Sequence, residues 1–258
     1  MIAVDHLSYS SISTFLTCGK AWKYRYINIV QADPSQSLII GSCVHDTVEE
    51  IIKCNSLGIE EPDTAEFAAQ TAQKRLESAG LNENTPEAET VKNEVLRLVS
   101  APVIQAAVEL IRAKIDDNGA MIEREVRLEV PEVDVPVIGY IDIVLADGTP
   151  ADFKTASKSW TADRAQNETQ PVFYLAAMGQ MGMPVNWHFK HLVMVKNKNP
   201  KFQTFDSERK PAEIGKLFLQ IQEVWKTMKA EVYLPAAPGS WKCNPKWCEY
   251  WRICHAEA

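Results

Sequence analysis

The sequence lacks several features that would assign it to a class at once. It has no apolar run near the roughly 20 residues that cross a membrane, and its first ten residues lack a basic segment followed by an apolar core. We therefore expect a cytoplasmic protein with no membrane partner. The sequence also has no internal repeat, no low-complexity tract and no Walker A pattern, so no ATPase is recognisable in it.

An excess of positive charge is lacking too, since the formal net charge is -7. This balance argues against a protein that merely coats nucleic acid. It does not argue against a nucleic-acid enzyme, because carboxylates that bind metal ions contribute negative charge. One stretch, residues 190–201, carries lysines with no acid among them. Within it Lys196 and Lys198 are secondary candidates for contacts with a phosphate backbone, the alternative being a solvated turn.

The apolar fraction of 46% and the charged fraction of 24% are ordinary for a globular protein, and 258 residues suffice for one large or two small domains. Periodicity and turn signals predict helices followed by strands that alternate with helices, which indicates an α/β fold with a helical N-terminal elaboration. The predicted helices are 7–27, 40–56, 61–78, 86–115, 170–179 and 212–230, and the predicted strands are 122–130, 135–145, 151–155, 187–195 and 202–205.

The most informative segment is G-Y-I-D-I-V-L-A-D-G-T-P-A-D-F-K-T, residues 139–155, which predicts two strands joined near Asp147-Gly148. A three-residue loop or a bulge at this turn would place Asp142, Asp152 and Lys154 on one face, because side chains alternate along a strand. In that register Ala146 pairs with Pro150, Val144 with Asp152 and Asp142 with Lys154. The opposite face would be apolar, with Ile141, Ile143, Leu145, Ala151 and Phe153.

Two carboxylates and one ammonium group on a shared face suit a metal-dependent hydrolase. Asp142 and Asp152 can bind Mg²⁺ or Mn²⁺ through oxygen, and Lys154 can orient an attacking water or stabilise developing charge. The alternative is a ladder of salt bridges on a solvent-facing hairpin, and these residues alone do not decide between the two.

Asp142 and the D-x-K of Asp152 and Lys154 resemble the core motif of the PD-(D/E)xK nucleases. Further motifs resemble the RecB-like branch, which includes AddB-type and CRISPR-associated iron–sulfur exonucleases. They are an aromatic helix around Cys18, the G-x-x-x-H of Gly41–His45, the Q-x-x-x-Y of Gln170–Tyr174 and a C-terminal cysteine triplet, in the family's order from Ser8 to Cys254. The resemblance implies a single domain over residues 1–258 with a mixed central β-sheet of the restriction-endonuclease type. Its parts would be a helical region of about 8–118, a nuclease core of about 119–232 and a cysteine segment, 240–255, joined to Cys18.

The resemblance also implies roles for individual residues. Asp142, Asp152, His45 and the Phe153 carbonyl would bind the catalytic metal, and Lys154 would be the catalytic lysine. Gln170 and Tyr174, one helical turn apart, would contact the substrate or position Lys154. Glu125 is a weaker candidate for a second acidic contact, with a surface charge pair as the preferred interpretation.

The cysteines fall into two groups in a chain expected to be kept reduced. Cys43 and Cys54 lie in apolar helical surroundings and are expected to be core residues. Cys243-x4-Cys248-x5-Cys254 lacks the C-x2-C pairs typical of zinc sites and leaves one ligand position, for which Cys18 is the best candidate.

The resemblance implies a [4Fe–4S] cluster on these four thiolates, with zinc as the alternative because the C-x4-C spacing and Gly19 depart from the family's pattern. Beside the cysteines we expect His255 to be an exposed neighbour rather than a ligand. We expect Trp241, Trp247 and Trp251 to shield the cluster rather than to stack on bases.

Together these features predict a metal-dependent DNA exonuclease acting on single strands or frayed ends, in repair, recombination, CRISPR adaptation or phage DNA processing. A helicase, recombination or CRISPR protein would be its partner and would supply any unwinding. The alternatives are an endonuclease, a non-catalytic nucleic-acid-binding iron–sulfur or zinc subunit, and a zinc-stapled interaction protein.

Overall fold

The computed structural model describes residues 4–32, 34–80 and 85–256. Its elements in chain order are β1 (Leu7–Ser8), α1 (Tyr9–Thr17), α2 (Gly19–Tyr26), α3 (Gln36–Leu57), α4 (Thr64–Ser78), α5 (Pro86–Val99), α6 (Pro102–Val108), β2 (Ile115–Asp116), β3 (Gly119–Ala120), β4 (Ile122–Leu128), β5 (Val137–Val144), β6 (Pro150–Ala156), α7 (Ala162–Asn167), α8 (Gln170–Gln180), β7 (His188–Val195), β8 (Lys201–Glu208), α9 (Glu213–Lys229) and α10 (Trp251–Ala256). Within the described ranges no helix combines the length and apolar character that a membrane crossing requires.

The first predicted helix, 7–27, is wrong in its continuity, because it contains β1 and two helices separated at Cys18. Cys18 has extended backbone angles (φ -162°, ψ 104°), and its N–H donates to the Thr14 carbonyl in the last turn of α1. Its Sγ accepts the N–H of Ala21, so the same residue caps the start of α2. The break therefore leaves the Cys18 sulfur at the N-terminus of a helix.

The predicted helix 86–115 is wrong for a simpler reason. Pro102 has no N–H to donate and disfavours helical geometry in the residue before it, so α5 ends at Val99 and α6 starts at Pro102. The chain then turns into the small β2–β3 ladder instead of continuing as a helix.

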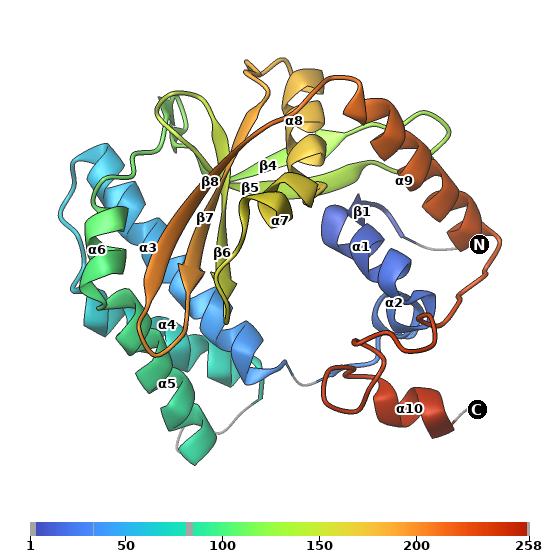
Figure 1. The fold of residues 1–258 in the computed structure, drawn as a ribbon, viewed down its shortest axis with the longest axis horizontal. Coiled ribbons are helices and arrows are strands. Elements are labelled where there is room, and N and C mark those ends of the chain that lie inside the picture. Colours follow the sequence, from blue (N-terminus) through green and yellow to red (C-terminus); the bar gives the residue numbers. More distant parts are fainter. Residues whose placement is uncertain (1–3, 33, 81–84, 257–258) are drawn as a thin grey trace.

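A mixed sheet forms the centre of the molecule, with the order β1-β5-β6-β7-β8 and β4 paired to β5 (Figure 1). β4 runs antiparallel to β5 along residues 137–143, so it occupies one edge of that strand. On the other edge β1 pairs with Val137 and Ile138, whereas β6 pairs only with Ile143 and Val144. Residues 139–142 of β5 therefore have no strand partner on this edge among the described strands, and β5 and β6 separate there as a fork.

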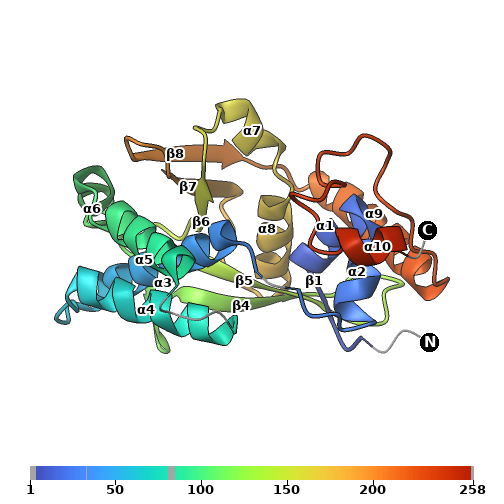
Figure 2. The same cartoon turned by 90° about the horizontal axis from the view of Figure 1, so that it is seen from below.

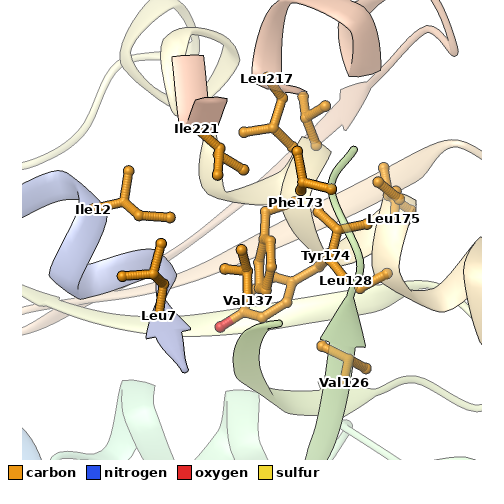
Figure 3. Close-up of a cluster of buried hydrophobic side chains, with 14 of the residues drawn as sticks. Leu7, Ile12, Val126, Leu128, Val137, Phe173, Tyr174, Leu175, Leu217 and Ile221 are labelled. Atoms are coloured by element: carbon orange, nitrogen blue, oxygen red, sulfur yellow. The ribbon is translucent and has the colours of Figure 1, made fainter. Parts of the chain in front are cut away.

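Helices cover both faces of the sheet. On one face α1, α8 and α9 enclose a core around Phe173 (Figure 3), whose buried members include Leu7, Ile12, Val126, Leu128, Val137, Leu175, Leu217 and Ile221. On the other face α3 to α6 bury Ile143, Ala151, Phe153, Leu192 and Met194. Figures 1 and 2 both show α3–α6 on one side of the molecule and α1, α2, α9 and α10 on the other. The mixed α/β fold expected from the sequence is thus confirmed.

Candidate active site

The turn between β5 and β6 is three residues long, as predicted, but β5 and β6 pair in a different register. Leu145 N–H donates to the Thr149 carbonyl at 2.8 Å, so the three-residue loop is 146–148, and Gly148 takes a positive φ of 86°. Val144 pairs with Pro150, where the sequence predicted Asp152. The predicted pairing is therefore wrong by two residues. A shift of two keeps the same side chains on the same face of a regular strand pair. The predicted single apolar face is nevertheless wrong for Ile141, which packs in the core around Phe173, whereas Ile143, Ala151 and Phe153 pack against α3–α6.

The predicted acidic residues and lysine converge where β5 and β6 separate. Lys154 Nζ lies 2.5 Å from Asp152 Oδ2. Asp142 reaches across the fork, where its Oδ2 accepts the N–H of Phe153 at 2.6 Å. Because the N–H and C=O of one residue in an extended strand point to the same edge, the Phe153 carbonyl also points toward the fork. Its role as a metal ligand stays a prediction.

Helix α3 brings His45 to the same place. His45 Nε2 lies 2.8 Å from Asp142 Oδ2, and the His45 ring meets the Phe153 ring edge-on at 5.5 Å. One turn earlier on the helix, a Cβ on Gly41 would lie 2.9 Å from Thr155 Oγ1. The glycine of G-x-x-x-H therefore permits the close approach of α3 to β6 that places His45 on Asp142.

The site contains two carboxylates that the sequence analysis missed. Ligand atoms of His45, Glu49, Glu123 and Asp142 all lie within 4.8 Å of one another. Glu49 is four residues after His45 on α3, a spacing that puts both on one helix face and could have signalled it. Glu123 is reached through an unusual backbone, with φ of 48°, which no sequence pattern announces.

Glu125, the acid considered instead, lies away from this group. Its Oε2 accepts a hydrogen bond from the exposed Tyr140 hydroxyl at 3.1 Å. The interpretation of Glu125 as a surface residue thus agrees with its position, although its partner is a hydroxyl and not a charge.

Burial governs the electrostatics of this group. Burial raises the pKa of Asp152 to about 7, with Lys154 opposing and Asp142 reinforcing the shift. Burial likewise raises the pKa of Glu49 to about 9. Burial would lower the pKa of His45, but the hydrogen bond and charge of Asp142 raise it to about 9. Glu49 Oε1 is buried and makes no well-aligned hydrogen bond among the described residues, although His45 Nδ1 lies 3.1 Å away. A bound divalent cation would offset the repulsion between the carboxylates and would give the Glu49 oxygen a partner.

Lys154 is held by a chain of hydrogen bonds from α8. Its Nζ donates to Gln170 Oε1 at 3.0 Å, and Gln170 Nε2 donates to the Tyr174 hydroxyl at 2.9 Å. The Tyr174 hydroxyl donates in turn to the Tyr140 carbonyl at 2.6 Å, on the unpaired edge of β5. Of the two roles predicted for Gln170 and Tyr174, this geometry favours positioning of Lys154.

The chain depends on close packing between α8 and β5. A Cβ on Gly139 would lie 2.5 Å from Phe173 Cε1 and 3.4 Å from Tyr174 Cε1. Only glycine permits this approach, which sets the Tyr174 hydroxyl against the β5 backbone.

The four cysteines expected to act together line one cavity of about 190 Å³. Burial raises the pKa of Cys248, and the neighbouring thiols Cys18, Cys243 and Cys254 raise it further. The C-terminal segment contacts α2 directly. Arg25 on α2 forms an ion pair with Glu249, with 2.8 Å between guanidinium nitrogen and carboxylate oxygen, and the ring centroids of Tyr24 and Tyr250 are 5.5 Å apart. Cys43 and Cys54 are buried in α3, as predicted.

A groove extends from the fork toward the cysteine segment. His45, Glu49, Glu123 and Lys154 line one part of it. Lys196 also lines it, and its Nζ donates to Ser37 Oγ at 2.6 Å. Lys198 is exposed in the β7–β8 turn and does not line this groove, which removes the geometric support for the second predicted phosphate contact.

Trp241 departs from the predicted shielding role, whereas Trp247 and Trp251 lie beside the cysteines. Trp241 lines the groove and not the cysteine cavity, Trp247 lines both, and Trp251 lines the cavity. His255 is exposed as predicted and stacks on Trp251 with ring centroids 3.6 Å apart.

A mixed sheet whose fork gathers carboxylates around one lysine is typical of metal-dependent nucleases. The family model of the PD-(D/E)XK nuclease superfamily matches residues 6–255, so the chain belongs to this superfamily. The superfamily resemblance drawn from the motifs is thereby confirmed, and the narrower RecB-like assignment stays a prediction.

Among solved structures, the fold is similar to that of a protein from Eubacterium rectale that is provisionally named an exonuclease. The TM-score is 0.58 at 12% identity, over 93% of this chain and 87% of that chain. A likeness at this identity shows a shared fold. Comparison with curated proteins gives no match.

Proposed function

We propose that this protein is a RecB-like, metal-dependent DNA exonuclease that acts on single strands and frayed ends. The observation that carries the proposal is the convergence of Asp142, Asp152 and Lys154 at the β5–β6 fork, with Lys154 Nζ 2.5 Å from Asp152 Oδ2. A solvent-facing ladder of salt bridges does not account for this site, because Asp142 and Asp152 are 8% and 2% exposed.

The donor set fits Mg²⁺ or Mn²⁺, which prefer carboxylate and carbonyl oxygen, with imidazole more suited to Mn²⁺. Asp142, Asp152, His45 and the Phe153 carbonyl would hold the ion, with Glu49 and Glu123 beside it. When bound, the ion would polarise the scissile phosphodiester and acidify a water.

Lys154 would orient the attacking water and offset the negative charge that develops on the phosphate. Gln170 fixes the ammonium group from α8, and Tyr174 fixes Gln170. The attack would be direct, without a covalent intermediate on the protein. Any unwinding of duplex DNA would come from a helicase or recombination partner, since the sequence carries no Walker A pattern.

We further propose a structural [4Fe–4S] cluster on Cys18, Cys243, Cys248 and Cys254. The cavity that these residues line measures about 190 Å³, more than ten times the roughly 10–15 Å³ that holds a single water. Cys18 lies at the start of α2, where its Sγ accepts the Ala21 N–H at 3.5 Å. The cluster would connect the two ends of the chain.

Cleavage of defined DNA substrates tests the nuclease proposal. With Mn²⁺ or Mg²⁺, linear single strands labelled at either end should be degraded, circular single strands should stay intact, and Asp152→Asn should abolish the activity. Absence of metal-dependent cleavage would refute the nuclease. Equal cleavage of circles and linear strands would refute the exonuclease.

Purification without oxygen tests the cluster. The wild-type protein should be coloured, with about four iron atoms per chain, and Cys18→Ser should lower the iron content while the matched control Cys54→Ser should not. A colourless protein that contains zinc would contradict the cluster proposal.

A further inference from the structure

Two tryptophans of the cysteine segment are exposed, although tryptophan has the largest side chain of the apolar residues. Trp241 is 67% exposed and Trp247 is 58% exposed. Their ring centroids are 6.3 Å apart with an interplanar angle of 76°. A pair of exposed aromatic rings is an informative feature because it leaves apolar surface in water that a ligand can cover. Shielding of the cysteines does not explain Trp241, which does not line their cavity.

Both tryptophans line a groove that is also lined by Lys154 of the catalytic fork. The same groove is lined by Lys154 and His45 at one part and by Trp241 and Trp247 at another. The two parts of the groove belong to segments far apart in the sequence. Helix α3 lies on one side of the molecule and the segment before α10 lies on the other (Figures 1 and 2). A strand bound along the groove would therefore touch the fork and the tryptophans at once.

The charges beside the two tryptophans indicate which part of a nucleic acid the rings would contact. Lys242 Nζ lies over the Trp241 ring, 5.5 Å from its centroid, and Lys246 Nζ lies over the Trp247 ring, 5.0 Å from its centroid. Phosphates can approach these cations while bases cover the ring surface that the lysines leave free. The chain as a whole has a net charge of -7, so phosphate attraction alone is a limited source of affinity. Stacking on aromatic rings is a source that does not depend on charge.

We propose that Trp241 and Trp247 form a base-stacking platform that holds the single-stranded part of a nucleic-acid substrate beside the catalytic fork. The inference rests on the proposed nuclease function and adds the origin of its preference for single strands. Bases in a duplex are covered by their neighbours, whereas unpaired bases expose the faces that stack on the indole rings.

Binding measured without cleavage tests the platform. In the Lys154→Ala protein, a labelled strand of about 12 thymidines is compared with an abasic strand of equal length, which keeps the phosphates but has no base to stack. Trp241→Ala and Trp247→Ala should each weaken thymidine binding roughly five-fold to 150-fold, as base–aromatic stacking predicts. Neither should change binding of the abasic strand. Trp241→Phe and Trp247→Phe should keep most of the affinity.

Cleavage by the otherwise wild-type protein separates this inference from the proposed function. Trp241→Ala should raise KM for single strands and leave kcat, iron content and Tm unchanged. If the protein cleaves single strands but Trp241→Ala and Trp247→Ala bind thymidine and abasic strands as the parent does, the platform is refuted and the nuclease stands. The tryptophans would then suit a protein partner. If the protein neither binds nor cleaves nucleic acid, both proposals fail.

Discussion

Gly41→Ala should damage the catalytic fork without touching a catalytic side chain. The added Cβ would lie 2.9 Å from Thr155 Oγ1, and ordinary contact begins at 3.4 Å. Helix α3 must therefore move away from β6 by about half an ångström, or Thr155 must turn, at a cost of roughly 1–3 kcal/mol in the free energy of unfolding. His45 moves with α3, while Asp142 stays on β5. Since misplacement by about 1 Å can cost 100-fold in rate, we expect kcat to fall about 10-fold to 100-fold.

A double-mutant cycle makes this prediction refutable. Among the described residues, and apart from the chain neighbours of Gly41 and the backbone of α3 itself, Thr155 Oγ1 is the one atom within 4 Å of a Cβ added to Gly41, so Thr155→Ala should clear the space. The double variant Gly41→Ala/Thr155→Ala should recover the kcat of Thr155→Ala alone. The control is Gly215→Ala in α9, where a Cβ meets nothing within 4 Å and activity should not change. The assay is kcat and KM on an end-labelled single strand with Mn²⁺, alongside urea unfolding. Full activity of Gly41→Ala, or no recovery in the double variant, would refute the reasoning.

Three further predictions follow from the site and its surroundings. Gln170→Ala should lower kcat roughly 10-fold to 150-fold, the worth of a hydrogen bond to the charged Lys154, with little change in KM, and an unchanged kcat would exclude positioning by Gln170. Glu123→Gln should weaken Mn²⁺ binding measured by calorimetry and the matched Glu125→Gln should not, so equal affinities would place Glu123 outside the metal site. Burial lowers the pKa of His191 to about 4, below the 6.5 of a histidine in an unfolded chain. Between these two pH values the unfolded state therefore binds more protons than the folded state, and the free energy of unfolding falls as the pH drops from about 6.5 to 4. The wild type should lose roughly 3 kcal/mol more over this range than His191→Leu in urea titrations, and parallel losses would contradict a buried neutral imidazole.

The β5–β6 hairpin could be predicted from the sequence, because alternation along two strands and one turn signal were enough to place Asp142, Asp152 and Lys154 together. The sequence could not determine which residues of β5 and β6 pair with each other. A shift of two residues leaves every side chain on its own face, so the apolar pattern is the same in both registers. Hydrogen bonds across the loop 146–148 decide the register, and sequence does not display them.

Other features were hidden because they depend on contacts between distant segments. β1 is two residues long, too short for any periodicity, yet its pairing to β5 helps to define the fork. Glu123 enters the site only through a positive φ. Pro102, by contrast, was visible in the sequence and marks a helix boundary that the long amphipathic pattern obscured.

The most direct test of the central claim compares Lys154→Ala with Lys158→Ala on one single-stranded substrate with Mn²⁺. Both lysines line the groove, but only Lys154 contacts Asp152. We expect Lys154→Ala to lower kcat at least about 100-fold, and Lys158→Ala to change KM while kcat stays near that of the wild type. Cleavage by Lys154→Ala at the wild-type rate would contradict a catalytic fork built on Asp142, Asp152 and Lys154.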